Sequence, residues 1–127
     1  MAHLATATRD GRPAVVPVCF VYSGNLIYST IDEKPKTTTR LLRIRNIAEN
    51  PYVSFIVDEY SENWRRLRYV ILAGTAKVLT RGREHRAAIQ SLRRKYRQYR
   101  TMRLEERQII RIKPIRTVVW RSISEKA

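Results

Sequence analysis

The sequence is poor in the residues that build disulfides, metal sites and nucleotide-binding turns. Its single cysteine, Cys19, rules out a disulfide within the chain, and we expect a reducing, cytoplasmic environment. Two histidines, His3 and His85, with one cysteine argue against a structural zinc site. The four glycines include no G-x-G-x-x-G pattern, which excludes a dinucleotide-binding Rossmann domain.

Long hydrophobic runs are also missing. No apolar segment reaches the ~18 residues of a membrane-spanning helix, and no signal peptide is visible before the polar residues that follow Thr8. The 127 residues, 43% of them hydrophobic, fit one globular domain over residues 1–127 with a substantial core. We therefore expect a single domain with no segment that crosses a membrane.

Negative charge is scarce. The chain has 11 acidic against 26 basic residues and a net charge of +15. Residues 81–116 hold 13 of the basic and 3 of the acidic side chains. This excess favours an anionic partner, which composition alone leaves open among nucleic acid, an acidic ligand and a membrane surface.

Strand patterns dominate what is present. Alternating or continuous apolar residues bounded by turns predict strands at residues 3–8, 14–22, 26–30, 52–58, 64–79, 108–113 and 117–122. Asp10-Gly11 predicts a hairpin turn between the first two strands. Pro17 marks an edge or a bulge, Gly74 permits a bend, and Pro114 separates the last two strands.

Two helices are expected between the strands. The first is capped by one of Thr37, Thr38 and Thr39 and ends at Asn50-Pro51. The second covers residues 83–100, with an apolar stripe of Ile89, Leu92, Tyr96 and Tyr99 that predicts core packing or a subunit contact. Its opposite side is rich in arginine, and two interpretations stay open for it: a solvated face, or a docking patch for an acidic tail.

The segment from residue 28 to residue 51 is the best candidate for a ligand site. A strand, a loop with Lys34 and Lys36, three threonines and a helix that opens with Arg40 follow one another. Free N–H groups at a helix start, hydroxyl groups and cations together suit a phosphate, although an ordinary capped helix with a basic face fits the same pattern. These elements predict a mainly β fold, a six- to seven-stranded antiparallel barrel with two interposed helices.

Four segments in this order resemble the split β-barrel flavin-binding family related to pyridoxamine 5′-phosphate oxidase. They read LATATRDGRPAVVPVCF, LIYSTIDEKPKTTTRLLRIRNIAENPYVSFIVD, WRRLRYVILAGTAKVL and IRIKPIRTVVWRS, and together they cover most of the chain. The K-P-K and R-N-I-A-x-N-P runs look most similar to members assigned to the deazaflavin coenzyme F-420. The resemblance implies a homodimer that binds FMN, or alternatively coenzyme F-420, at the subunit interface.

The resemblance also assigns the cofactor-binding residues. Lys34, Lys36, Thr37, Thr38 and Arg40 would surround the phosphate, and Arg43 would reach it. Tyr28 and Ser29 would touch the phosphate or ribityl chain. The ring would lie along Val16, Pro17 and Val18, and Trp64 would contact it from the partner subunit.

The implied function is a small oxidoreductase, because such a ring carries the hydride chemistry itself. No nucleophile set is visible: Cys19 is expected in the core and His85 at the surface or in a dimer contact. A non-enzymatic flavin carrier or sensor would have the same cofactor pocket. A basic nucleic-acid-binding module fits the charge, but no helix-turn-helix, zinc finger or RNP signature is present.

Overall fold

The computed structural model describes the backbone of residues 1–30 and 38–122, and the side chains of residues 1–30 and 42–122. The strands and α-helices are β1 Ala2–Ala7, β2 Pro13–Val18, β3 Val21–Ser23, β4 Leu26–Thr30, α1 Thr38–Glu49, β5 Tyr52–Glu59, β6 Arg68–Leu79, α2 Arg83–Lys95 and β7 Ile109–Arg121. Short 3-10 helices follow at η1 Trp64–Arg66, η2 Arg97–Thr101 and η3 Leu104–Glu106. Within these residues no helix has the length and apolar character needed to cross a bilayer.

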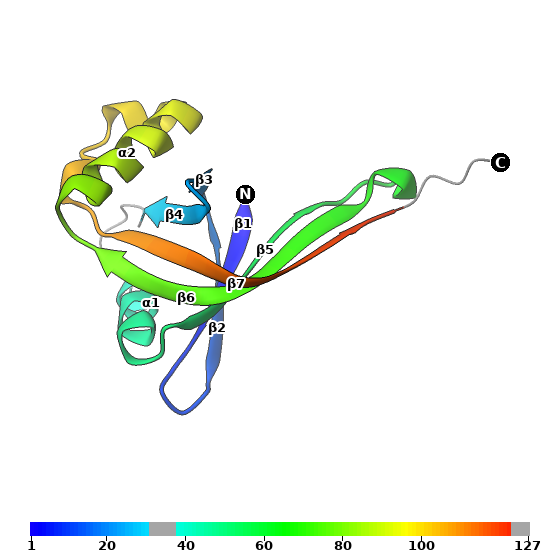
Figure 1. Ribbon diagram of the computed structural model, residues 1–127, viewed down its shortest axis with the longest axis horizontal. Helices are drawn as coiled ribbons and strands as arrows, with labels where there is room; N and C mark the ends of the chain where they lie inside the picture. The colour runs from blue at the N-terminus through cyan, green and yellow to red at the C-terminus, as the bar shows by residue number, and fades with distance from the viewer. Residues whose placement is uncertain (31–37, 123–127) are drawn as a thin grey trace.

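The seven strands form one curled sheet in the order β2-β1-β5-β6-β7-β4-β3. Each pair of neighbours is antiparallel. The long strands β6 and β7 curve through the whole molecule, and both helices lie toward one end of them (Figure 1). The expected mainly β, antiparallel split barrel with two helices is confirmed.

The two faces of the sheet have separate cores. We call the face that carries Leu4, Phe55 and Leu72 the inner face; α1 packs on it through Ile47. The opposite, outer face carries Tyr28, against which α2 packs with Ile89 and Leu92. Because successive strand residues point to opposite faces, each strand serves both sides of the sheet.

Helix α1 ends where the sequence predicts. Its last residue is Glu49, and Asn50 then bonds in three directions before Pro51. The Asn50 backbone N–H donates to the Asn46 carbonyl at 2.7 Å, its side-chain amide donates to the Thr8 carbonyl at 3.1 Å, and its side-chain oxygen accepts from the Tyr52 N–H at 3.2 Å. Asn50 therefore ties the helix end to both the β1–β2 hairpin and the start of β5.

The two strands expected on either side of Pro114 are in fact one strand, β7. Ala73 pairs with Arg116 and Gly74 with Pro114, so Ile115 is the extra residue of a bulge. β4 pairs with β7 only as far as Ile112, which leaves one side of β7 without a partner at Pro114. The missing N–H of proline therefore removes no ladder bond on that side, and the strand continues.

Two other expected boundaries are wrong for a common reason: side chains take the backbone groups that a longer element would need. The expected strand 14–22 is broken at Phe20, whose N–H donates to the Tyr96 hydroxyl at 3.0 Å and whose carbonyl accepts from that hydroxyl at 2.9 Å. The expected helix 83–100 ends at Lys95. There the Arg100 guanidinium donates to the Arg93 carbonyl at 2.9 Å, and η2 replaces the last turns.

The strand expected over residues 64–79 begins later, at Arg68. Residues 64–66 form η1 instead, because the Asn63 side chain accepts a hydrogen bond from the Arg65 N–H at 3.2 Å. His85 is a further correction. It is buried at 2% exposure, and its Nε2 lies 2.8 Å from the Arg107 carbonyl. It precedes Ile89 by four residues and so shares the inward side of α2.

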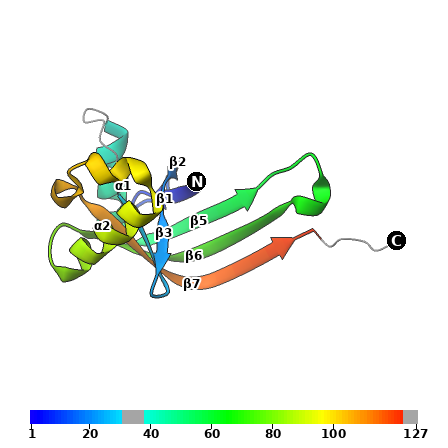
Figure 2. The same ribbon diagram turned by 90° about the horizontal axis from the view of Figure 1, so that it is seen from above.

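The ends of β5, β6 and β7 that lie farthest from the helices extend from the body as an arm, which we define as residues 56–71 and 117–121. Figures 1 and 2 show β5, β6 and β7 running side by side away from both helices, with η1 at the tip. The arm has no helix over it, and it exposes apolar side chains such as Val119 and Trp120 at 68% and 44%. A three-stranded ribbon that exposes apolar residues in this way is expected to be covered by a ligand or another protein surface.

Gly74 should be the most restrictive position in the sheet. A Cβ atom there would overlap the backbone carbonyl of Lys113 at the bulge, and backbone cannot rotate away as a side chain can. We expect Gly74→Ala to destabilise the fold by about 3 kcal/mol, the upper end of the usual range for overpacking in a core, measured by urea unfolding. Ala73→Val adds more volume at an exposed neighbour and serves as the control; equal effects would refute the assignment.

A second prediction concerns the bond between β4 and α2. The Tyr28 hydroxyl donates to Glu84 at 2.6 Å, and Arg111 donates to the same carboxylate at 2.9 Å. Burial and the bond to Glu84 raise the pKa of Tyr28 to about 12. The bond from Tyr28 lowers the pKa of Glu84. Tyr28→Phe should cost about 1–2 kcal/mol at pH 7 by urea unfolding.

The pH dependence of that cost provides the check. A carboxyl with a lowered folded-state pKa contributes stability above its unfolded pKa of 4.5 and loses it as the pH falls through the folded value. The stability difference between the parent and Tyr28→Phe should therefore shrink below pH 4.5. An unchanged difference at pH 3 would show that the charged bond is not its source.

Candidate functional site

The expected phosphate site lies in the right order along the chain, between β4 and α1. Lys34, Lys36 and Thr37 fall outside the described residues. Thr38 and Arg40 lie in the first turn of α1, where the structure describes the backbone only. β4 precedes α1 as expected of this site, and the roles of these five side chains stay predictions.

The three residues expected along the ring lie on β2, which is an edge strand. β2 pairs with β1 alone, so the backbone groups along its other side have no strand partner. Val16 and Val18 face the inner core, whereas Pro17 is exposed on the outer face. The three side chains therefore do not share one surface, and a planar ligand would meet them together only along the strand edge.

Tyr28 and Ser29, adjacent on β4, point to opposite faces. Tyr28 is turned under α2, where its hydroxyl bonds to Glu84. Ser29 points inward, is fully buried, and donates to the Cys19 carbonyl at 2.7 Å. Both hydroxyls thus have partners within the fold, and Ser29 links the end of β4 to the end of β2.

Thr30 is a candidate that the sequence reasoning missed. It is 4% exposed, and its hydroxyl has no hydrogen-bond partner among the described residues. It is the last residue of β4, immediately before the lysine-bearing loop. A buried hydroxyl without a partner is costly, so this position fits a polar ligand. The sequence could have pointed to Thr30 only through its place at the end of an apolar strand.

Arg43 brings two parts of the expected site together. It lies on α1 and, with Leu42 of the same helix, lines a small hollow of about 20 Å³ whose other side includes Val16 of β2. The arginine-bearing face of α1 thus meets the strand expected to lie along the ring. Two segments separated by more than twenty residues thus line one hollow, and the cofactor roles of Val16 and Arg43 stay predictions.

Trp64 lies apart from all of these residues. It is 70% exposed on η1 at the tip of the arm, far along β5 and β6 from the body (Figure 1). Within one chain it does not approach β2 or α1. Its expected role requires the arm to reach a second copy of the chain.

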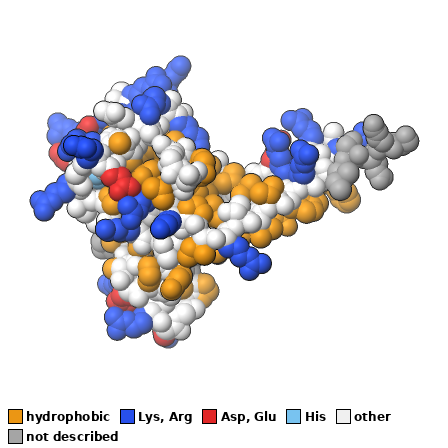
Figure 3. All heavy atoms as spheres, viewed as in Figure 1, with side chains coloured by type: hydrophobic (Ala, Val, Ile, Leu, Met, Phe, Trp, Pro, Cys, Tyr) orange, Lys and Arg blue, Asp and Glu red, His pale blue; other side chains and the backbone are white. Residues whose placement is uncertain are grey.

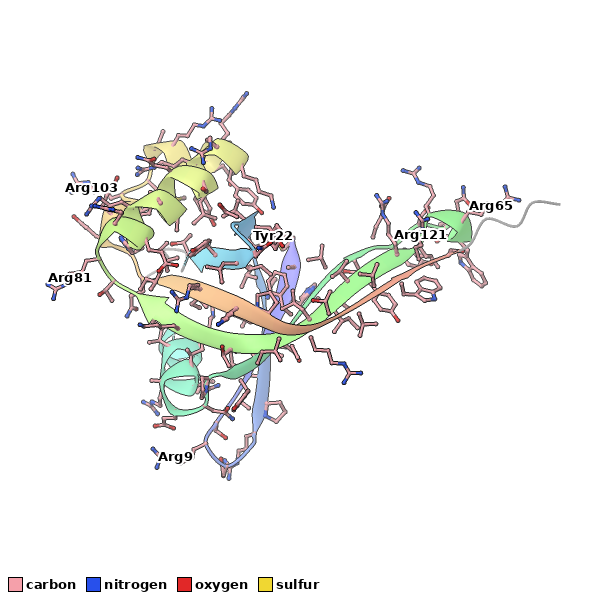
Figure 4. The ribbon with its side chains drawn as sticks, in the orientation of Figure 1. Arg9, Tyr22, Arg65, Arg81, Arg103 and Arg121 are labelled. Atoms are coloured by element: carbon pink, nitrogen blue, oxygen red, sulfur yellow. The ribbon has the colours of Figure 1, made fainter. Side chains whose placement is uncertain are left out.

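The basic face of α2 carries arginines that are not paired with a carboxylate among the described residues. Arg83, Arg86 and Arg94 are exposed, and none has a carboxylate within ion-pair distance in the part of the chain that the structure describes. Arg93 differs, because it bonds to Glu105 at 2.7 Å. Arginines also point outward at Arg9, Arg81 and Arg103 (Figure 4), so positive charge surrounds the body instead of lining one cleft.

Other reaction types have little support in residues 1–30 and 38–122. No three His, Cys, Asp or Glu side chains gather there as a metal site would need. Cys19, as expected, packs partly buried against the core under α2. The polar groups that remain near β2, β4 and α1 fit an anionic ligand that lies along a strand edge: the unpaired side of β2, the Thr30 hydroxyl and the start of α1.

Comparison with known proteins identifies the family of this chain. The sequence model of the family described as pyridoxamine 5′-phosphate oxidase matches residues 1–121. A 5a,11a-dehydrotetracycline/5a,11a-dehydrooxytetracycline reductase of Streptomyces rimosus is 32% identical over 120 residues, which cover 93% of this chain and 72% of the reductase.

Solved structures have the same architecture. An FAD-binding protein of Mesorhizobium loti superposes with a TM-score of 0.68 at 26% identity, over 91% of this chain and 81% of that one. The haem storage protein HutZ of Vibrio cholerae superposes with a TM-score of 0.71 at 19% identity, over 94% of this chain and 84% of that one, which shows the fold alone. The chain belongs to the pyridoxamine 5′-phosphate oxidase family.

Proposed function

We propose that this protein is a homodimeric oxidoreductase that binds FMN, with coenzyme F-420 as the alternative, between β2, β4 and the start of α1. The observation that carries the proposal is the convergence of Arg43 and Val16 on one hollow. Through this hollow the basic helix α1 approaches the inner face of β1 and β2. The reductase relationship supports an oxidoreductase, and the FAD-binding relative supports a flavin-type cofactor.

Each part of the site would bind a different part of the cofactor. Lys34, Lys36, Thr37, Thr38 and Arg40 would hold the phosphate, with Arg43 nearby. Thr30 would supply its free hydroxyl to the phosphate or the ribityl chain, and Ser29 would position the strand ends through its bond to Cys19. Tyr28 would contribute only its backbone, since its side chain is turned under α2.

The edge of β2 would orient the ring. Backbone N–H and C=O groups of successive strand residues point to opposite edges, so Pro17 presents its carbonyl on one side of β2 and Val16 and Val18 present theirs on the other. A bound flavin or deazaflavin would supply the hydride transfer. The protein would bind and orient the ring and exclude water, which agrees with the lack of a dedicated nucleophile.

The partner subunit would cover the outer face of β2, β1, β5, β6 and the arm. This face has no helix over it among the described elements, and it carries Val15 at 64%, Tyr52 at 67% and Val118 at 43% exposure. His3, Ala5 and Ile71 line a shallow hollow within it. An apolar surface of this kind on a soluble protein marks an interface, and covering it with a second copy would carry each arm, with Trp64, toward the other subunit.

Two other functions would use the same surfaces. A non-enzymatic flavin carrier or sensor would bind the same cofactor without turnover, so oxidation of a reduced nicotinamide or reduced deazaflavin distinguishes it. Haem, the ligand in the name of HutZ, has less support here. His85 is buried against the Arg107 carbonyl, and His3 is exposed on the outer face, away from β4 and α1.

Cofactor binding should depend on the phosphate. We expect titration followed by visible absorbance to give one FMN per subunit. Lys36→Ala and Arg40→Ala should each weaken FMN binding about tenfold, or about 1.4 kcal/mol, because each removes a charge-assisted bond to phosphate. Neither change should affect riboflavin, which lacks the phosphate.

The control for these variants is Arg86→Ala on α2, which removes one exposed arginine far from β2. Equal weakening of riboflavin and FMN, or equal weakening by the control, would show that the phosphate is bound elsewhere. Parallel titration with coenzyme F-420 decides between the two cofactors. If neither cofactor binds, the proposed function is wrong.

The dimer has its own test. Val118→Arg together with Ile71→Arg places two charges on the outer face of the arm, where burial of unpaired charge is strongly unfavourable. We expect sedimentation velocity to show a monomer for this variant and a dimer for the parent. Ala87→Arg, on the exposed side of α2, is the control and should remain dimeric. A parent that sediments as a monomer would refute the interface.

A further inference from the structure

The inner face of the arm is an uncovered trough that begins at the mouth of the barrel. Cross-strand neighbours on this face form three successive rows, since paired residues of adjacent strands point the same way. From the body to the tip, the rows are Phe55, Leu72 and Thr117, then Val57, Val70 and Val119, then Glu59, Arg68 and Arg121. The floor is thus apolar for two rows and charged at the third.

The trough is continuous along its length. A hollow of about 510 Å³ at the body end shares Val57 and Val70 with a second hollow of about 390 Å³. The second shares Glu59, Arg68 and Arg121 with a third of about 580 Å³ at the tip. Tyr22 lies beside the body end and Arg121 beside the tip (Figure 4), and apolar surface runs between body and tip in the space-filling view (Figure 3).

The tip hollow carries an excess of positive charge. It is lined by Arg65, Arg66, Arg68 and Arg121 and one carboxylate, Glu59. Glu59 bonds to Arg68 at 2.7 Å and lies 3.6 Å from Arg66. Arg65 and Arg121 have no carboxylate within ion-pair distance among the described residues. Two guanidinium groups are therefore available to an anion.

A second copy of the chain fits this trough poorly. In a twofold interface the same patch meets itself, so the arginines of the tip would be buried against apolar rows or against other arginines. The one carboxylate is already paired, and burying unpaired cations is costly. The outer face, where Val15, Ile71 and Val118 are exposed, is the better surface for a second subunit.

The dimensions indicate the size of the occupant. Two rows along a strand span about 7 Å, and the floor from the Leu72 row to the Arg68 row is about 13 Å. Three strands give a width of about 10 Å. A flat or extended hydrocarbon body of that length would cover the valines while its acidic group reached the arginines.

We propose that the trough binds an apolar organic acid: its hydrocarbon body lies on Val57, Val70 and Val119, and its carboxylate, sulfonate or phosphate is held by Arg65 and Arg121. The body end of the trough adjoins the candidate cofactor site, because Phe20 lies two residues after the end of β2 and Ile27 lies on β4 two residues before Ser29. Such an acid would then be the substrate class of the oxidoreductase. That last identification rests on the proposed function, whereas the binding site does not.

Two fluorescent probes that differ mainly in charge test the site. We expect 1-anilinonaphthalene-8-sulfonate to bind the cofactor-free protein at least tenfold more tightly than neutral N-phenyl-1-naphthylamine. The two tryptophans of the chain, Trp64 and Trp120, both lie on the arm, so the bound probe should accept energy from tryptophan. Arg65→Gln together with Arg121→Gln should weaken the sulfonate about tenfold or more, since charge-assisted bonds are the stronger class, and leave the neutral probe unchanged.

The matched control is Arg81→Gln together with Arg83→Gln, which removes the same charge from the far end of the body. Equal loss of sulfonate binding in the control would show that net charge alone attracts the probe, and the proposal would fail. It would also fail if both probes bound the parent equally. Val119→Asn should weaken both probes, because it places an amide on the apolar floor; no effect would exclude the valine row.

Displacement of the bound sulfonate probe by other acids then identifies the chemical class of the acid. Displacement of the sulfonate probe by decanoate assigns an aliphatic acid, and displacement by naphthalene-1-sulfonate assigns a flat aromatic acid; displacement by neither overturns the proposal. FMN titration of the same variants separates the two proposals. Intact FMN binding without charge selectivity in the trough refutes the trough alone, and charge-selective probe binding without FMN binding refutes the cofactor proposal alone.

Discussion

The close approach of β6 and β7 at Gly74 is the constraint on which the rest of the structure depends. There the backbone of Lys113 and Pro114 occupies the space that a side chain would need, and the register shifts by one residue. On one side of this bulge the two strands complete the barrel with β4 and β5, and on the other they form the arm with β5 alone. Body and arm are therefore parts of one ladder and not two units joined by a hinge.

The faces of that ladder divide the molecule by chemistry. Its inner face encloses the core beneath α1 and then continues into the trough, where apolar rows end at arginines. Its outer face is sealed by α2 at one end through Tyr28 and Glu84, and it stays apolar and uncovered at the other. Arginines gather on the exposed side of α2 and at the arm tip, and the uncovered part of the outer face also carries Asp58 and Arg116. A cofactor, a second subunit and an acid would thus each meet a surface of a different kind.

Much of this arrangement follows from local sequence patterns. The strand at residues 26–30, the helix end at Asn50-Pro51 and the stripe of Ile89, Leu92 and Tyr99 are visible as periodicity and capping signals, and they are present as predicted. The break at Phe20 was not predictable, because it depends on Tyr96, 76 residues away. The spacing of His85 from Ile89 could have indicated its burial, but its partner, the Arg107 carbonyl, was not predictable. For the site, pattern identified the strands and helix, but only the sheet shows that Tyr28 and Ser29 point apart and that Thr30 has a free hydroxyl.

The alternation of faces along the arm also limits how its length can change. Inserting one residue into β6 just before Gly74 would turn every side chain between the insertion and η1 to the other face, so Arg68 would leave the trough and Tyr69 would enter it. Insertions in this hairpin therefore preserve both surfaces only in steps of two residues, matched in β5 and β7. Arm lengths that are tolerated by proteins built on this plan should form a discrete series, each step adding one complete row to the floor of the trough.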